Sequence, residues 1–223
     1  MTLDLAPLWL TLKLAGLSTV LLLLIGTPLA WWLARSRSRV RTVVEALIAL
    51  PLVLPSTVLG FYLLLLLSPQ GAVGGLWQTL GGQNLAFSFS GLLIGSVIYS
   101  LPFVVQPLQN SFQAVGEELL EAAAVLRASA WDAFRTVAVP LSARGFLTAT
   151  VLGFTHTIGE FGIVMMIGGN IPGRTQTLSI AIYDHVEMLE YGKAHTLSAI
   201  LLGFAFLAML LMYTVNHKQA DKQ

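Results

Sequence analysis

Five long apolar stretches dominate this chain of 223 residues, and they constrain its fold more than any other feature. They run approximately over residues 9–33, 43–67, 87–108, 146–169 and 194–215. An α-helix needs about 20 consecutive apolar residues to cross the hydrocarbon layer of a bilayer. We therefore predict an all-α integral membrane protein with about five transmembrane helices, organised as a single membrane domain over residues 1–223.

The composition supports a location in a bilayer. Hydrophobic residues make up 56% of the chain, charged residues 10%, and the mean hydropathy is +0.78, which leaves too little polar surface to enclose an apolar core in water. The net charge of +1 provides no basic patch for a run of phosphates, so we expect no nucleic-acid partner. The chain has no cysteine, which excludes disulfides and thiolate metal sites.

The basic residues predict the orientation. Nine of the twelve Lys and Arg residues lie in the link after the first stretch, in the loop 109–145 or in the tail: Arg35, Arg37, Arg39, Arg41, Arg127, Arg135, Arg144, Lys218 and Lys222. The positive-inside rule makes this side cytoplasmic. We therefore expect the N-terminus outside, the C-terminus in the cytoplasm and the loop 109–145 on the cytoplasmic side.

Prolines interrupt the second and third stretches, at Pro51 and Pro55 and at Pro102 and Pro107. Each removes a backbone hydrogen bond and bends the helix, which lipid permits only where protein or a wet cavity covers the freed carbonyl. Both stretches should therefore face other helices. Two interpretations remain open: the bends only allow the helices to pack in a bundle, or the bent helices line a permeation route.

The loop 109–145 is predicted to contain two short helices. Residues 111–126 are rich in Ala, Leu and Glu, and Ser129 with Asp132 forms a capping-box pattern that opens a second helix ending at Pro140. The loop also carries more apolar surface than a solvated segment needs, and this surface comes from Leu119, Leu120, Ala123, Leu126, Trp131 and Phe134. A protein partner explains this surface, and an amphipathic helix lying on the bilayer is the alternative.

One motif in this loop suggests the partner. Glu121, Ala122 and Ala123 are followed at fixed spacing by Arg127, Val137, Val139 and Pro140. The pattern resembles the EAA loop of bacterial ABC-importer permeases, which has Gly, Ile and Leu where this chain has Arg127, Val137 and Val139. The resemblance implies a cytoplasmic coupling loop that docks on an ATPase subunit, with these coupling residues: Glu121, Ala122, Ala123, Arg127, Trp131, Phe134, Val137 and Pro140. Either the turn at Arg127 has an ordinary backbone conformation, or it is left-handed and the fold carries a strain of about 1 kcal/mol for a non-Gly residue.

A second segment resembles one branch of that family. His156-Thr157-Ile158-Gly159-Glu160-Phe161-Gly162, the following residues 169–175, and Pro51-Leu52-Val53-Leu54-Pro55 are similar to permeases for tetrahedral oxyanions. The resemblance implies import of molybdate or tungstate, with sulfate or thiosulfate as the alternative. It also implies a bacterial inner-membrane homodimer in lipid, two ATPase subunits and a periplasmic oxyanion-binding protein. The permease itself is not expected to be an enzyme or to hold a cofactor.

Glu160 is the only carboxylate deep inside a predicted span, where a charge is costly. His156 lies four residues earlier on the same helical face, so the two side chains can share a proton or a hydrogen bond. A polar link or gate hinge, a direct pathway role and a metal site remain open, although the metal site needs further ligands.

The segment that follows is expected to form the outer mouth. In the Gly-rich loop 168–175, Asn170 and Arg174 are pathway candidates, and free backbone N–H groups are suited to meet an anion. Residues 176–190 have apolar positions at helical spacing but are too short and too charged for another span. We expect this segment to dip into the mouth as a gate.

Two functions of other classes remain open. A proton-coupled secondary transporter would use Glu160 and His156 as a relay, although such folds usually show internal repeats and none is evident here. A structural membrane scaffold would carry no flux. No catalytic triad or paired-carboxylate pattern appears in the sequence.

Overall fold

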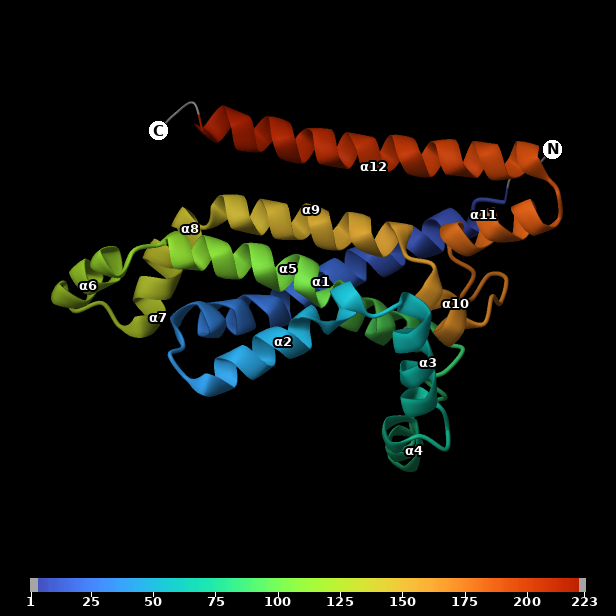
Figure 1. The fold of residues 1–223 in the computed structure, drawn as a ribbon, viewed down its shortest axis with the longest axis horizontal. Coiled ribbons are helices and arrows are strands. Elements are labelled where there is room, and N and C mark those ends of the chain that lie inside the picture. The colour runs from blue at the N-terminus through green and yellow to red at the C-terminus, as the bar shows by residue number, and fades with distance from the viewer. Residues whose placement is uncertain (1–3, 221–223) are drawn as a thin grey trace.

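The computed structural model describes residues 4–220, with side chains described up to residue 215. All regular secondary structure in that part is helical, as predicted. Three helices, α1 (Ala6–Arg35), α5 (Phe89–Ala114) and α9 (Ala143–Gly159), pack against one another along the long axis. Helix α12 (Tyr191–Ala220) runs along α9 on the outside of the bundle (Figure 1).

Four helical segments are long and apolar enough to cross a membrane: Ala6–Arg35, Ser56–Thr79, Phe89–Ala114 and Tyr191–Val215. A fifth span results if Ala130–Leu141 and Ala143–Gly159, which are bent by 71°, are counted as one. The stretches predicted at 9–33, 87–108 and 194–215 are confirmed as α1, α5 and α12. Of the tail residues used for orientation, the side chain of Lys218 and all of Lys222 lie outside the described part.

The prediction of one continuous span over 43–67 is wrong. The chain forms α2 (Arg39–Val53) and α3 (Ser56–Leu67), separated at Leu54 and Pro55. Leu54 has an extended backbone with ψ 137°, because proline disfavours the helical conformation in the residue before it. Helix α3 leaves the bundle at a steep angle and is followed by α4 (Ala72–Thr79) (Figure 1).

The predicted span 146–169 is also divided. Helix α9 ends at Gly159, and α10 (Gly162–Gly168) begins after the non-helical residues Glu160 and Phe161. A Cβ atom at Gly162 would collide with the side chain of Ser56 on α3, so glycine allows α10 to pack closely there. The division produces a short helix that packs on α3 and α5.

The loop 109–145 folds into short helices with boundaries that differ from the prediction. Residues 111–126 are not one helix, because α5 continues to Ala114 and α6 (Glu117–Val125) begins after Gly116. The Ser129 and Asp132 capping box is confirmed and opens α7 (Ala130–Ala133). A π-helix η1 (Phe134–Ala138) and α8 (Val139–Leu141) follow, so the helical run ends at Leu141 rather than at Pro140.

A predicted helix after the Gly-rich loop is confirmed as α11 (Leu178–Glu187). Leu178, Ile180 and Ala181 are buried, and α11 packs on α12, α1 and α9. Its expected role as a gate remains a prediction.

Arg35 joins the ends of two central helices. Its Nη2 atom donates hydrogen bonds to the carbonyl oxygens of Phe112 at 3.1 Å and Val115 at 2.8 Å, and its guanidinium lies 5.0 Å from the ring centroid of Trp31. These bonds satisfy carbonyl groups at the C-terminal end of α5 that have no partner within the helix. Arg35 therefore fixes the end of α5, from which the loop 109–145 departs, against the end of α1.

Candidate functional site

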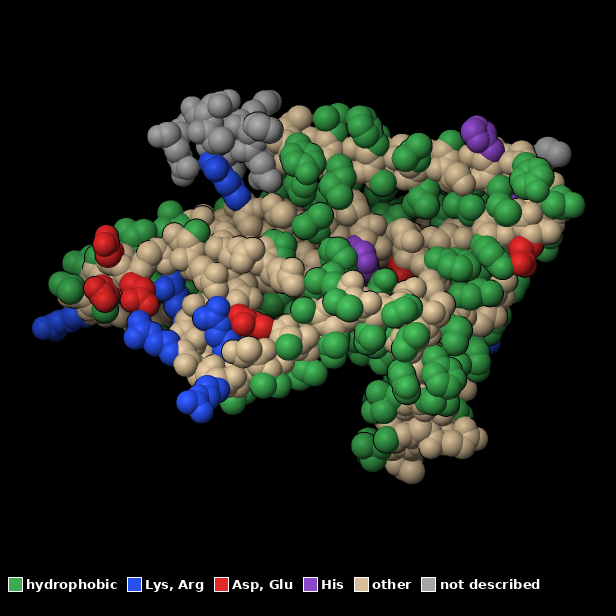
Figure 2. Space-filling view, viewed as in Figure 1, with side chains coloured by type: hydrophobic (Ala, Val, Ile, Leu, Met, Phe, Trp, Pro, Cys, Tyr) green, Lys and Arg blue, Asp and Glu red, His purple; other side chains and the backbone are tan. Residues whose placement is uncertain are grey.

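The segment 117–141, here called the knob, projects from one end of the bundle and consists of α6, α7, η1 and α8 (Figure 1). Figure 2 shows that basic and acidic side chains gather over this end, whereas hydrophobic side chains cover α3 and much of α12. The charge asymmetry agrees with a polar end outside the lipid and an apolar body within it.

Arg127 occupies the left-handed position that ends α6. Its φ angle is +62°, its N–H donates to the Ala124 carbonyl at 2.9 Å, and the Ala128 N–H donates to the Ala123 carbonyl at 3.0 Å. This pair of bonds is a Schellman motif, in which glycine is usual at the left-handed residue. The helix therefore ends in the turn that glycine usually forms, and the Arg127 backbone carries the strain of the left-handed conformation.

We expect Arg127→Gly to raise the free energy of unfolding by about 1 kcal/mol, because glycine adopts this conformation without a Cβ clash. Arg135→Gly is the matched control, since glycine within a helix lowers stability by about 1 kcal/mol. Thermal unfolding of both variants in detergent measures the difference. A loss of stability in Arg127→Gly would contradict the strain described here.

The knob exposes an apolar surface made by Leu119, Val125, Leu126 and Trp131. Their exposed fractions are 50%, 82%, 83% and 65%. The sequence indicated three of these side chains but missed Val125. Such a group of large apolar side chains at a polar end is typical of a protein contact.

The predicted coupling residues lie at different depths in the knob. Glu121, Ala122 and Arg127 are exposed, as is Pro140 in α8, whereas Ala123 is buried and Val137 is partly buried. Glu121 lines a shallow cavity of about 310 Å³ together with Arg35, Glu117, Leu120 and Ala124. Ala123 therefore packs inside the knob, and the exposed residues of the motif remain available to a partner.

Phe134 connects the knob to the bundle. Its ring stacks on that of Trp131 at 5.5 Å between centroids, meets Trp31 of α1 edge-on at 5.0 Å and lies 5.9 Å from Phe112 of α5. Such aromatic pairs contribute about 0.5–1.5 kcal/mol each beyond area burial. The side chain that borders the exposed surface thus also contacts both central helices.

Glu160 and His156 do not interact as the sequence suggested. His156 contacts the Ser100 hydroxyl through Nδ1 at 2.9 Å and stacks on Phe103 with 3.8 Å between ring centroids. Glu160 is 5% exposed, and neither carboxyl oxygen makes a hydrogen bond to another described residue. The expected hydrogen bond between the two is wrong, because α9 ends at Gly159 and the helical register does not continue to residue 160. No group of three His, Cys, Asp or Glu residues in the described part could hold a metal.

We expect Glu160→Leu to stabilise this conformation, because a buried carboxyl without a partner carries a desolvation penalty of about 1–3 kcal/mol. The thermal unfolding midpoint in detergent should rise, whereas Glu118→Leu, on the exposed face of α6, should leave it nearly unchanged. A clear fall in the midpoint of Glu160→Leu would show that the carboxyl has a stabilising partner.

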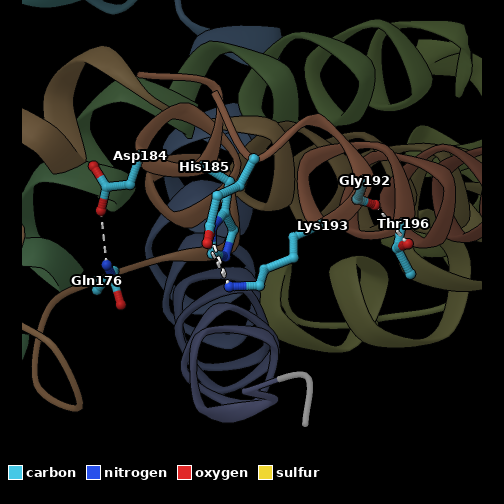
Figure 3. Close-up of polar contacts among 7 residues, drawn as sticks. Gln176, Asp184, His185, Gly192, Lys193 and Thr196 are labelled. Carbon is cyan, nitrogen blue, oxygen red and sulfur yellow. Dashed lines mark hydrogen bonds and ion pairs between the residues drawn. The ribbon is translucent and has the colours of Figure 1, made fainter. Parts of the chain in front are cut away.

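The outer loop is held by Asp184 of α11. Asn170 donates through Nδ2 to both carboxylate oxygens at 3.0 and 2.9 Å. Gln176 donates through Nε2 to one of them at 2.8 Å, as Figure 3 shows. The N–H groups of Arg174, Thr175 and Gln176 all donate to the Ile171 carbonyl. The expectation of free N–H groups in the loop is therefore wrong for Arg174 and Thr175, and it stays a prediction for Asn170 and Gly173. Of the two pathway candidates, Asn170 is partly buried and bound to Asp184, whereas Arg174 is exposed.

The sequence did not indicate the ionic cluster between α11 and α12. Lys193 donates through Nζ to both oxygens of Glu190 at 2.8 Å, and His185 Nδ1 lies 2.8 Å from Glu190 Oε2 (Figure 3). The hydrogen bond from Lys193, followed by that from His185, holds the pKa of Glu190 below its ordinary value. The cluster joins the end of α11 to the start of α12.

Comparison with known proteins places these features in context. The family model described as binding-protein-dependent transport system inner membrane component matches residues 26–220. The molybdenum transport system permease protein ModB of Azotobacter vinelandii is 58% identical over 217 residues, which cover 97% of this chain and 96% of that protein.

A probable sulfate transport system permease protein, cysT of Zygnema circumcarinatum, is 34% identical over 94% of this chain and 72% of its own length. Among solved structures, the inward-facing methionine ABC transporter MetNI matches with a TM-score of 0.74 and 16% identity over 96% of this chain and 94% of that chain. At 16% identity, this match shows that the two chains share a fold and nothing more.

Proposed function

Because the chain belongs to the family of binding-protein-dependent inner-membrane transport components, we propose that it is the permease subunit of an ATP-driven importer for molybdate. The observation that carries the proposal is the 58% identity with a molybdenum permease along nearly the whole of both chains. Tungstate has the same tetrahedral shape and charge and is expected to share the route.

The knob is the proposed docking element for a partner ATPase subunit on the cytoplasmic side. Its exposed surface of Leu119, Val125, Leu126 and Trp131 contacts the ATPase subunit. Phe134 transmits movement of that subunit to α1 and α5 through its ring contacts. Two permease copies, each engaged by one ATPase subunit, would enclose the route at their twofold axis. Closure of the ATPase pair then moves the bundles between outward-open and inward-open forms.

The cargo is delivered by a periplasmic binding protein at the outer face, near α11 and the loop 169–177. The central spans α1, α5 and α9 contain no ring of Lys or Arg between their ends, so the anion is held weakly on its way. Weak holding suits transport, since a strong internal site would trap the ion. Selection of the ion therefore belongs mainly to the binding protein.

Transport in reconstituted vesicles tests the proposal. Vesicles that contain the permease, the ATPase and the binding protein should accumulate radiolabelled molybdate only with ATP, and uptake should persist when the proton gradient is collapsed. Excess unlabelled tungstate should compete strongly and sulfate weakly. Effective competition by sulfate would favour the second candidate function, a sulfate permease, which is suggested by the relative cysT at 34% identity. Uptake that needs a proton gradient and no ATP would contradict the proposal.

We expect Trp131→Ala to weaken ATPase binding by about 2 kcal/mol or more, because large aromatic anchors dominate interfaces. That corresponds to about a 30-fold rise in Kd, measurable by titrating ATPase onto the permease in nanodiscs. Trp77→Ala is the matched control, because Trp77 is 47% exposed but lies on α4, away from the knob. Equal Kd values for Trp131→Ala and the native permease would exclude the knob as the main contact.

A further inference from the structure

An open cavity of about 460 Å³ with apolar walls and a group of polar side chains lies between α2 and α5, next to the basic link that follows α1. Its polar lining comes from Thr42 and Glu45 on α2 and from Gln106, Gln109 and Asn110 on α5. Liquid water takes about 30 Å³ per molecule, so the cavity has room for a tetrahedral oxyanion and several waters. This cavity belongs neither to the knob surface nor to the outer loop.

Glu45 lines the cavity and accepts hydrogen bonds from two donors: Gln109, which also lines it, and Arg41, which lies one turn before Glu45 on α2 and is not part of the lining. Its Oε1 atom accepts a bond from Arg41 Nε at 2.8 Å and another from Gln109 Nε2 at 2.6 Å. One carboxylate oxygen thus receives a guanidinium N–H from α2 and an amide N–H from α5. This arrangement is the one that an oxyanion oxygen would require. It also links the cytoplasmic ends of the two helices.

Further donors surround the same space. The side chains of Thr42, Gln106 and Asn110 line the cavity and make no hydrogen bond to another described residue. Arg39 at the start of α2 adds positive charge at this end, whereas the charge of Arg37 is offset by its ion pair with Glu117. An anion that approaches the cavity would therefore meet unengaged polar groups and the field of Arg39, opposed by the Glu45 carboxylate.

We propose that this cavity is an inner binding site for a tetrahedral dianion, in which the anion displaces Glu45 from Arg41 and Gln109. When no anion is bound, the Glu45 carboxylate occupies both donors and links α2 to α5. The arriving anion takes over both donors, and the released Glu45 repels it, which promotes its departure into the cytoplasm. The cargo itself thereby loosens the contact between α2 and α5 at the step that releases it. The inference rests on the proposed function and its cytoplasmic orientation.

Direct anion binding to the permease–ATPase complex in nanodiscs, without binding protein, tests the site. Ala49 lines the cavity and the chain has no cysteine, so Ala49→Cys carries a single bimane fluorophore when a cysteine-free ATPase is used. Molybdate and sulfate are titrated at constant ionic strength, with chloride as the control anion. We expect both dianions, but not chloride, to shift the fluorescence.

Glu45→Gln should lower the Kd for the dianions about tenfold, because it removes the competing charge while keeping a side chain of similar size. Adding Gln109→Met should raise the Kd again at least tenfold, since one donor is lost. Glu187→Gln, an exposed carboxylate on α11, is the control and should leave the Kd unchanged.

An unchanged or higher Kd in Glu45→Gln, or no fluorescence shift in any variant, would overturn the inner site. If the native complex still imports molybdate with ATP, that result leaves the proposed function intact. Failure of the native complex to transport any oxyanion would instead contradict the proposed function, whatever the cavity binds.

Discussion

The contact of Phe134 with Trp31 and Phe112 is the interaction on which the arrangement of this protein depends. Beyond the backbone, the knob is also linked to the end of α1 by the Arg37–Glu117 ion pair, whose side chains are 88% and 68% exposed. Exposed pairs of this kind contribute about 0–1 kcal/mol. The aromatic contacts, together with Ala138, which is buried in the same hydrophobic cluster, are therefore the main packing that holds the knob against α1 and α5. Without them, a push on the knob would bend the loop and leave the helices in place.

The bilayer imposes the second constraint, because every backbone group at membrane depth needs a partner. The chain breaks two predicted spans, at Leu54–Pro55 and at Glu160–Phe161, and the short helices that follow, α3 and α10, pack against each other. Gly60 permits this approach, since a Cβ atom there would lie 2.9 Å from Met166 Cβ. The two interruptions thus lie where α3 and α10 pack against each other, and α10 joins this pair to α5 of the long bundle.

The sequence predicted the features that depend on local chemistry. Apolar length predicted α1, α5 and α12, and the Ser129–Asp132 pattern predicted the start of α7. The motif spacing predicted a turn at Arg127 but left open whether its backbone is ordinary or left-handed, and the structure has the left-handed form. Features that depend on tertiary packing were not predictable. Residues 146–169 have the length and apolar character of one span despite His156 and Glu160, and the break after Gly159 coincides with a tertiary contact, the close fit of Gly162 on Ser56. The Glu45–Gln109 contact joins residues 64 positions apart, and no local pattern indicates it.

The central claim is that the knob faces the cytoplasm and is covered by a partner ATPase there. Leu126 is 83% exposed at the tip of the knob, and the chain has no cysteine, so Leu126→Cys provides a single labelling site. A membrane-impermeant maleimide should leave this cysteine unmodified in intact cells, label it in inside-out vesicles stripped of ATPase, and label it slowly once the ATPase is restored. Rapid labelling in intact cells would contradict the account.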